Sequence, residues 1–255
     1  MDNKDSILIW TDSLENSALL KHGMELAQKL DTNYYILSCA PTDKKFTLVL
    51  PNGEIIQSAS KKAAGFIFEN KNQFGILFAI TDVDFTGEVL TKESVKKIKR
   101  LKKTELSFIC LKENFSLSTY SKLLTITGYG SGEKEKVMWA NYISKKLKST
   151  LHIMVPTEKD EYIGKDITGI RYYSQKLLTQ SGNSFEIHDF KENTEKLKNN
   201  YTFSQLDENA LYIVNIQYIN FNPFKKDSDI LYIERSGKTA IMVVPETDDS
   251  LIPCH

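Results

Sequence analysis

The chain has 255 residues, more than the roughly 100–150 residues of a typical single domain, so it allows two domains. Its 33 basic and 33 acidic side chains balance, which excludes a chain-wide nucleic-acid surface because such binding depends on neutralising phosphates. The three cysteines form no CxxC pair, and no apolar run reaches the roughly 18 residues of a membrane span. We therefore expect a cytoplasmic protein with no disulfide framework, no nucleic-acid partner and no membrane span.

A strand–helix–strand unit opens the chain. Residues 1–5 precede it and lack the pattern of a signal peptide. The apolar run 7–10 predicts a buried strand, and residues 11–17 after it are rich in helix-capping side chains. Apolar side chains then recur at helical spacing up to Leu30, and residues 34–40 predict a second strand. Such a unit implies two parallel strands joined by a right-handed crossover.

The rest of the first half is less regular. Two strand-like runs within residues 46–56 flank Pro51-Asn52-Gly53, a pattern that predicts a β-hairpin. The polar, serine-rich segment 112–121 predicts a linker to the second half. Between hairpin and linker the predicted elements are a helix at 60–69, a strand at 75–81, a helix at 91–103 and a strand at 106–111.

The second half repeats the opening unit. A shift of 117 residues places residues 7–37 on residues 124–154 without a gap, and the apolar positions agree. We interpret this agreement as an internal duplication. The matching elements are a strand at 123–127, a glycine-rich turn at 128–132, a helix at 133–147 and a strand at 150–155.

Helices and strands continue to alternate after the repeated unit. Five strands alternating with four helices in this half predict an α/β domain with a doubly wound parallel sheet. The later elements are a helix at 165–180, a strand at 184–188, a weak helix at 191–206, a strand at 210–216, a short helix at 228–235 and a strand at 239–244.

Three segments resemble the universal stress protein family. Residues 6–17 and 25–30 look like the strand, acidic-serine loop and helix that open such a domain, and residues 229–245 look like its ending. The resemblance implies two tandem flavodoxin-like domains, 1–113 and 122–255, each with the strand order 3-2-1-4-5. The first domain would be irregular because of its inserted hairpin. The resemblance also implies dimerisation, often through the last strand, and adenine-nucleotide binding in some members.

The nucleotide-binding members carry an aspartate after the first strand and a glycine-rich phosphate loop after the fourth. Asp12 matches the aspartate, whereas Tyr129 stands at the corresponding place in the second half. Neither residues 80–87 nor residues 215–223 match the phosphate loop, whose glycines let backbone N–H groups close on the anion. We therefore expect no cofactor, with ATP or AMP as the alternative ligand.

Two loops are candidate ligand-binding sites. One follows the first strand; the other lies between a strand and a helix N-terminus, a place that favours anions. Glu133 and Glu135 already satisfy the dipole of that helix, so the ordinary explanation of the second loop is a tight turn capped by Ser131. The candidate residues are Thr11, Asp12 and Ser13 in the first loop, and Gly128, Tyr129, Gly130 and Ser131 in the second.

Three carboxylates form a candidate metal site. Asp12 follows the first strand, and Asp82 and Asp84 follow the fourth, so the expected strand order brings them to the switch point where α/β sheets bind ligands. Mg²⁺ prefers such oxygen ligands. The ordinary explanation is that Asp12 and Asp82 cap helices or turns.

The basic segment 92–103 is a further candidate. Val95, Ile98 and Leu101 predict its buried face, so the lysines are expected to face solvent, with an acidic partner or nucleic acid as the alternative. The chain contains no GxSxG motif that would nominate a nucleophile. The four histidines show no HxH or HExxH spacing, so the sequence predicts no zinc site. They are His22, His152, His188 and His255.

We therefore expect a non-catalytic protein of stress-response type, either regulatory or ligand-binding. It would act through a small-molecule pocket at the switch point or through an interface, as a homodimer or a pseudo-dimer of its two domains, with a protein partner that the sequence does not identify. The alternatives are an adenine-nucleotide-binding protein and a Mg²⁺-dependent phosphoryl-transfer enzyme using Asp12, Asp82 and Asp84.

Overall fold

The computed structural model describes residues 5–39, 45–58, 62–86, 89–112, 120–129, 132–191, 210–216 and 240–245. The chain divides into two compact units, Met1–Leu117 and Ser118–His255. Each unit is described by itself.

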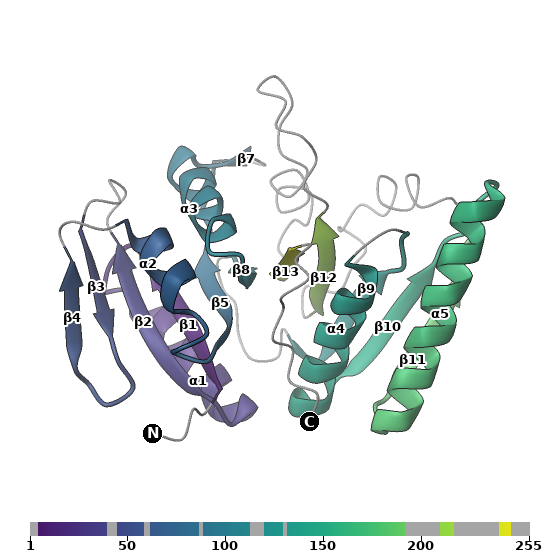
Figure 1. Ribbon diagram of the computed structural model, residues 1–255, viewed down its shortest axis with the longest axis horizontal. Coiled ribbons are helices and arrows are strands. Elements are labelled where there is room, and N and C mark those ends of the chain that lie inside the picture. Colours follow the sequence, from purple (N-terminus) through teal and green to yellow (C-terminus); the bar gives the residue numbers. More distant parts are fainter. Residues whose placement is uncertain are drawn as a thin grey trace. The chain divides into compact units, whose positions relative to one another are not determined.

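The sheet of the first unit is centred on a strand that is buried along its whole length, β1. β2 and β5 flank β1 in parallel, and β8 continues the sheet in parallel beyond β5. Beyond β2, the antiparallel hairpin β3–β4 forms the other edge (Figure 1). The strands are β1 (Ser6–Thr11), β2 (Asn33–Cys39), β3 (Phe46–Val49), β4 (Ile55–Ser58), β5 (Ile76–Asp82) and β8 (Ser107–Leu111).

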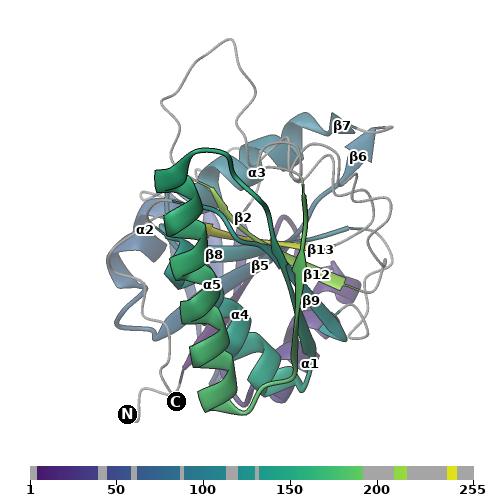
Figure 2. The same ribbon diagram turned by 90° about the vertical axis from the view of Figure 1, so that its right-hand side faces the viewer.

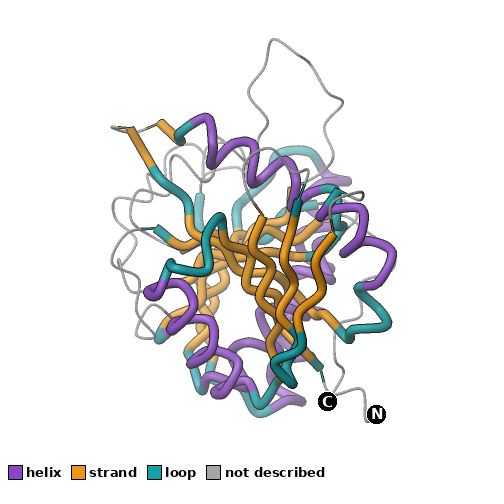
Figure 3. Tube along the Cα trace, turned by 90° about the vertical axis from the view of Figure 1, so that its left-hand side faces the viewer, coloured by secondary structure: helices purple, strands orange, loops and turns teal. Residues whose placement is uncertain are grey.

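Three helices complete the first unit: α1 (Ser17–Leu30), α2 (Ala63–Asn70) and α3 (Lys92–Lys102). Helices lie on both sides of the strand layer, as Figure 3 shows. α1 packs closely on the sheet at Gly23, where an added Cβ would lie 2.5 Å from Ile9 Cδ1. A short antiparallel pair, β6 (Phe85–Thr86) and β7 (Val89–Leu90), connects β5 to α3.

The second unit is a five-stranded parallel sheet in the order β11-β10-β9-β12-β13. α4 and α5 pack against one another on one face of it (Figure 2). The core includes Leu151 and Ile153 of β10 and most of β12 and β13. The elements are β9 (Lys122–Ile126), α4 (Glu133–Leu147), β10 (Thr150–Val155), α5 (Glu161–Ser181), β11 (Phe185–Asp189), β12 (Ala210–Ile216) and β13 (Ala240–Pro245).

The predicted fold class is confirmed. Both units follow the order 3-2-1-4-5, and in the first unit the antiparallel strand β3 takes the third place. The predicted helix at 165–180 begins earlier, at Glu161, because the Asp160 carboxylate accepts hydrogen bonds from the N–H groups of Tyr162 and Ile163. The helices predicted at 191–206 and 228–235 lie outside the described residues.

Among the residues that the structure describes, no helix is both long and apolar enough to cross a membrane.

Candidate functional site

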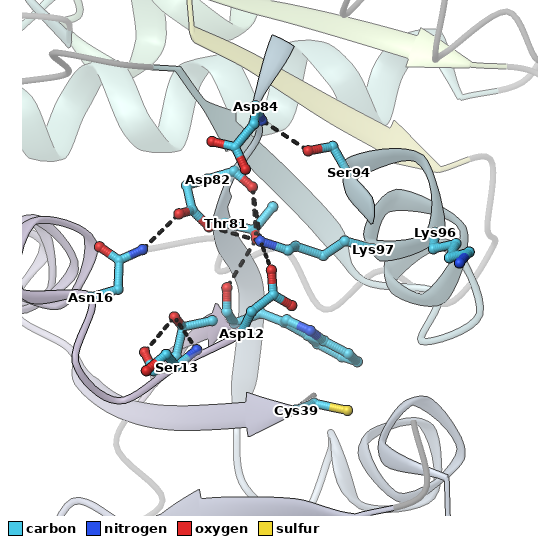
Figure 4. Close-up of polar contacts among 12 residues, drawn as sticks. Asp12, Ser13, Asn16, Cys39, Thr81, Asp82, Asp84, Ser94, Lys96 and Lys97 are labelled. Carbon is cyan, nitrogen blue, oxygen red and sulfur yellow. Dashed lines mark hydrogen bonds and ion pairs between the residues drawn. The ribbon is translucent and has the colours of Figure 1, made fainter. Parts of the chain in front are cut away.

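The carboxyl ends of β1 and β5 form the switch point of the first unit (Figure 4). Asp12 directly follows β1, and Asp82 is the last residue of β5. The turn after β1 is held by Thr11, whose hydroxyl donates to the Ser13 carbonyl (2.8 Å) and accepts from the Ser13 N–H (3.2 Å). Strand pairing and this turn together place the two carboxylates on the same edge of the sheet.

A lysine that the sequence did not nominate lies between these carboxylates. Lys97 Nζ of α3 contacts Asp12 Oδ2 at 2.6 Å and Asp82 Oδ1 at 2.9 Å (Figure 4). It also donates to the Asp82 carbonyl at 3.3 Å. The Lys97 side chain is only 3% exposed. An ammonium group has three N–H donors, so these three acceptors use all of them.

The electrostatic environment keeps Lys97 charged. Burial by itself lowers the pKa of the Lys97 ammonium, but the attraction of Asp82 and Asp12 outweighs it, and the pKa is raised above its ordinary value. Asp82 is held from its other side, where Asn16 Nδ2 donates to Asp82 Oδ2 at 2.6 Å. The result is a fixed cluster of two carboxylates and one ammonium.

The structure bears on two roles expected of these aspartates, as helix caps and as ligands of Mg²⁺. Neither Asp12 nor Asp82 caps a helix, because Asn16 caps α1 and Thr91 caps α3. Asp84 uses its backbone N–H to bind Ser94 Oγ at 2.8 Å, which ties the strand end to the start of α3. A magnesium site at Asp12, Asp82 and Asp84 stays a prediction, and the ion would have to displace the ammonium from between two of these carboxylates.

One carboxylate oxygen of this cluster lacks a hydrogen-bond donor among the described residues. This oxygen is Asp12 Oδ1, and it is buried. A buried carboxylate oxygen without a donor carries a desolvation cost of about 1–3 kcal/mol. This atom is therefore the place in the cluster that a ligand N–H or O–H group would satisfy.

The second unit also carries a lysine–carboxylate pair after its first strand. Glu133 Oε2 accepts from the Gly128 N–H at 2.7 Å and from Lys136 Nζ at 2.7 Å. Lys136 Nζ also donates to the Ile126 carbonyl at the end of β9. The two side chains are 6% and 3% exposed, so the pair is internal. Glu133 lies in the first turn of α4, where it was expected to satisfy the helix dipole, and its carboxylate also closes the loop from within.

Side chains of the protein itself fill the space beside the glycines of this loop. An added Cβ at Gly128 would meet Glu133 Oε1, and one at Gly132 would meet the Asn215 amide from the end of β12. The predicted Ser131 cap is wrong: Gly132, with φ of 80°, is the N-cap of α4 and makes no side-chain cap bond. The backbone here needs a positive φ, which glycine adopts readily. Tyr129 is exposed; Gly130 and Ser131 lie outside the described residues.

The buried face of α3 differs from the predicted one, and this difference explains why Lys97 was missed. Ser94, Lys97, Ile98 and Leu101 are buried, whereas Val95 is only half-buried. The sequence interpretation followed the apolar residues and treated every lysine as solvated. Positions 94, 97, 98 and 101 share one helical face, and this spacing was the available signal.

Comparisons with known proteins support the fold. No family model and no curated protein sequence matches the chain. A candidate universal stress protein from Pseudomonas aeruginosa UCBPP-PA14 superposes with a TM-score of 0.57 at 13% identity, covering 95% of this chain and 93% of that one. A functionally unknown protein from Pseudomonas aeruginosa PAO1 gives 0.57 at 14% identity, with coverage of 96% and 94%. A universal stress protein from Archaeoglobus fulgidus DSM 4304 gives 0.53 at 11% identity, with coverage of 95% and 88%. The chain is thus similar to universal stress proteins in fold.

Proposed function

We propose that the protein is a regulatory or binding protein of universal-stress-protein type that acts in the cytoplasm without catalysing a reaction. The fold similarity supports the class of protein. The observation that carries the proposal is the ion cluster at the first switch point. There, all three N–H donors of the Lys97 ammonium contact oxygens of Asp12 and Asp82. The position at which related folds bind ligands is held by the protein's own charges.

The cluster disfavours phosphate for two reasons. Two carboxylates outnumber one ammonium, so an approaching phosphate meets net negative charge. The Lys97 ammonium has no donor left. Residues 80–87 contain one glycine, Gly87, and not the glycine-rich loop through which backbone N–H groups would bind the anion. In the second unit, Glu133 already takes the Gly128 N–H.

A regulatory protein of this kind acts through an interface, and we propose that it associates as a homodimer or a pseudo-dimer of its two domains and binds a further protein. The near-zero net charge is compatible with self-association, since no large like-charge repulsion opposes it. Light scattering of the purified chain measures this directly: a mass of one chain at high concentration excludes the homodimer.

A thermal-shift series with ATP, AMP and Mg²⁺, alone and combined, tests the proposal. A nucleotide present at about 100 times its Kd would add about 2.7 kcal/mol of stability, which corresponds to a Tm rise of about 5–10 °C at this chain length. We expect no rise with any of them. A reproducible rise in Tm with ATP or AMP would overturn the proposal that the protein acts without binding a nucleotide.

Adenine-nucleotide binding is the second candidate, and the unsatisfied Asp12 Oδ1 favours it. If this candidate is correct, the Tm rise with ATP or AMP will disappear in Asp12→Ala and persist in the control Glu54→Gln, which removes an exposed carboxylate in the β3–β4 turn. A Mg²⁺ response that is lost in Asp82→Asn would instead support phosphoryl-transfer chemistry.

A further inference from the structure

Two histidines and a glutamate converge on the outer strand pair of the second unit. His152 on β10 is the register partner of Glu186 on β11, and His188 lies two residues farther along β11. Residues two apart on a strand share a face, so all three side chains project from the same face of this pair. The two histidines are 36 positions apart in the sequence, and only strand pairing brings them together.

The three candidate ligand atoms form a compact triangle. His152 Nδ1 lies 3.1 Å from His188 Nε2 and 3.3 Å from Glu186 Oε2. His188 Nε2 lies 3.5 Å from the same Glu186 oxygen. Within the described part of the chain, this is the one group of three His, Cys, Asp or Glu residues whose ligand atoms all lie within 4.8 Å of one another.

We propose that His152, His188 and Glu186 bind a zinc ion, with a fourth position open to water or to another ligand. Zinc favours tetrahedral coordination by imidazole nitrogen and carboxylate oxygen, with bonds of about 2.0–2.1 Å. Ligand atoms of such a tetrahedron lie about 3.3–3.4 Å from one another, and the three observed separations fall on either side of this value. This site is separate from both switch points and does not depend on the proposed regulatory function.

The local environment suits a metal. The side chains of His152, His188 and Glu186 are 18%, 42% and 59% exposed, so an ion can reach them from solvent. Without metal, the two nitrogens lie at hydrogen-bond distance, so one ring N–H lies between them. To bind zinc, that ring must carry its proton on its other nitrogen and the rings must turn, so that both lone pairs point at the ion.

Zinc would clamp the edge strand β11 to β10. The ligands come from two strands that are separated in the sequence by α5, so the bound ion closes a long loop of chain. The open fourth position distinguishes this arrangement from a structural site with four protein ligands. The site therefore has room for water or for a donor group from a binding partner.

The test is zinc binding by the full chain without an affinity tag. After treatment with a chelator, the protein is titrated with Zn²⁺ by calorimetry, and Co²⁺ replaces Zn²⁺ for absorption spectroscopy. We expect one equivalent bound and a visible Co²⁺ spectrum typical of four-coordination. Removing a residue that only orients a metal ligand weakens metal binding by about 10–100-fold. His152, His188 and Glu186 would bind the ion directly. Therefore His152→Ala, His188→Ala and Glu186→Gln should each weaken zinc binding by at least about 100-fold.

The matched control is Asp189→Asn. Asp189 is the next residue after His188, projects from the opposite face of β11 and pairs with Arg171, so its removal should leave zinc affinity unchanged. The double variant Cys254→Ala/His255→Ala tests for an adventitious site at these two residues, and it should bind zinc as tightly as wild type. Circular dichroism confirms that each variant folds. The proposal is overturned if the wild-type chain binds no zinc, or if the histidine variants bind it as tightly as wild type.

Discussion

Replacing Lys97 with methionine removes the ammonium while keeping a side chain of similar length. Asp82 keeps its hydrogen bond from Asn16, but both carboxylates lose their common cation. Asp12 then retains one buried oxygen without a donor and loses the contact of the other. The substitution therefore isolates the contribution of the ammonium from that of the hydrocarbon chain.

The size of the effect follows from burial. Breaking a buried ion pair by removing one partner costs about 3–5 kcal/mol because the other charge is left uncompensated. The side chains of Asp12 and Asp82 are 35% and 24% exposed, so water recovers part of this loss. We expect Lys97→Met to destabilise the first unit by about 2–3 kcal/mol. Adding Asp82→Asn should restore part of this, with a coupling of about 1 kcal/mol or more.

The chain provides a reporter for each unit. It contains two tryptophans, and Trp10 lies in the first unit and Trp139 in the second, both buried. Urea unfolding followed by tryptophan fluorescence in a Trp139→Phe background therefore reports on the first unit. A Trp10→Phe background reports on the second unit, which should be unaffected by Lys97→Met.

Two outcomes would refute this reasoning. One is a loss below about 0.5 kcal/mol, the range of ordinary surface substitutions, which would mean that the ammonium is solvated. The other is additivity of Lys97→Met and Asp82→Asn, which would mean that the two groups do not interact.

Three further predictions concern single residues. Burial lowers the pKa of His22 from its ordinary 6.5 to about 4. Between these two pH values the folded state binds fewer protons than the unfolded state, so the free energy of unfolding falls as pH falls. In urea unfolding, His22→Gln should reduce the slope of that free energy against pH by up to about 1.4 kcal/mol per pH unit. Gly132→Ala should cost about 1–3 kcal/mol in urea unfolding, from the positive φ and the contact with Asn215. Glu133→Gln should cost about 2–4 kcal/mol by the same measurement, since Lys136 keeps its buried charge without a carboxylate.

Two of these predictions have a matched control variant. Gly169→Ala, in the exposed middle of α5 with nothing near the added Cβ, should stabilise by about 0.5–1 kcal/mol, opposite in sign to Gly132→Ala. Glu161→Gln removes an exposed carboxylate in α5 and should change stability by less than about 0.5 kcal/mol. An unchanged pH slope in His22→Gln would show that carboxylates alone account for the acid sensitivity.

The sequence predicted the elements well because their signals are local. The apolar run of β1, the Pro-Asn-Gly turn between β3 and β4 and the helical spacing of α4 depend only on nearby residues. The sequence also shows the repeat of one strand–helix–strand unit 117 residues farther along the chain. Strand order 3-2-1-4-5 was available only through resemblance to a family with that order.

Tertiary structure alone decided which charged and imidazole groups meet. Lys97 reaches Asp12 because β5 lies beside β1 and α3 follows β5, and no spacing along the chain encodes that contact. His152 meets His188 because the register of β10 against β11 places them on one face, whereas a slip of one residue would turn one of them to the other face. Local propensity determines which segments become helices and strands, but side-chain chemistry between segments depends on pairing and register, which only the folded chain supplies.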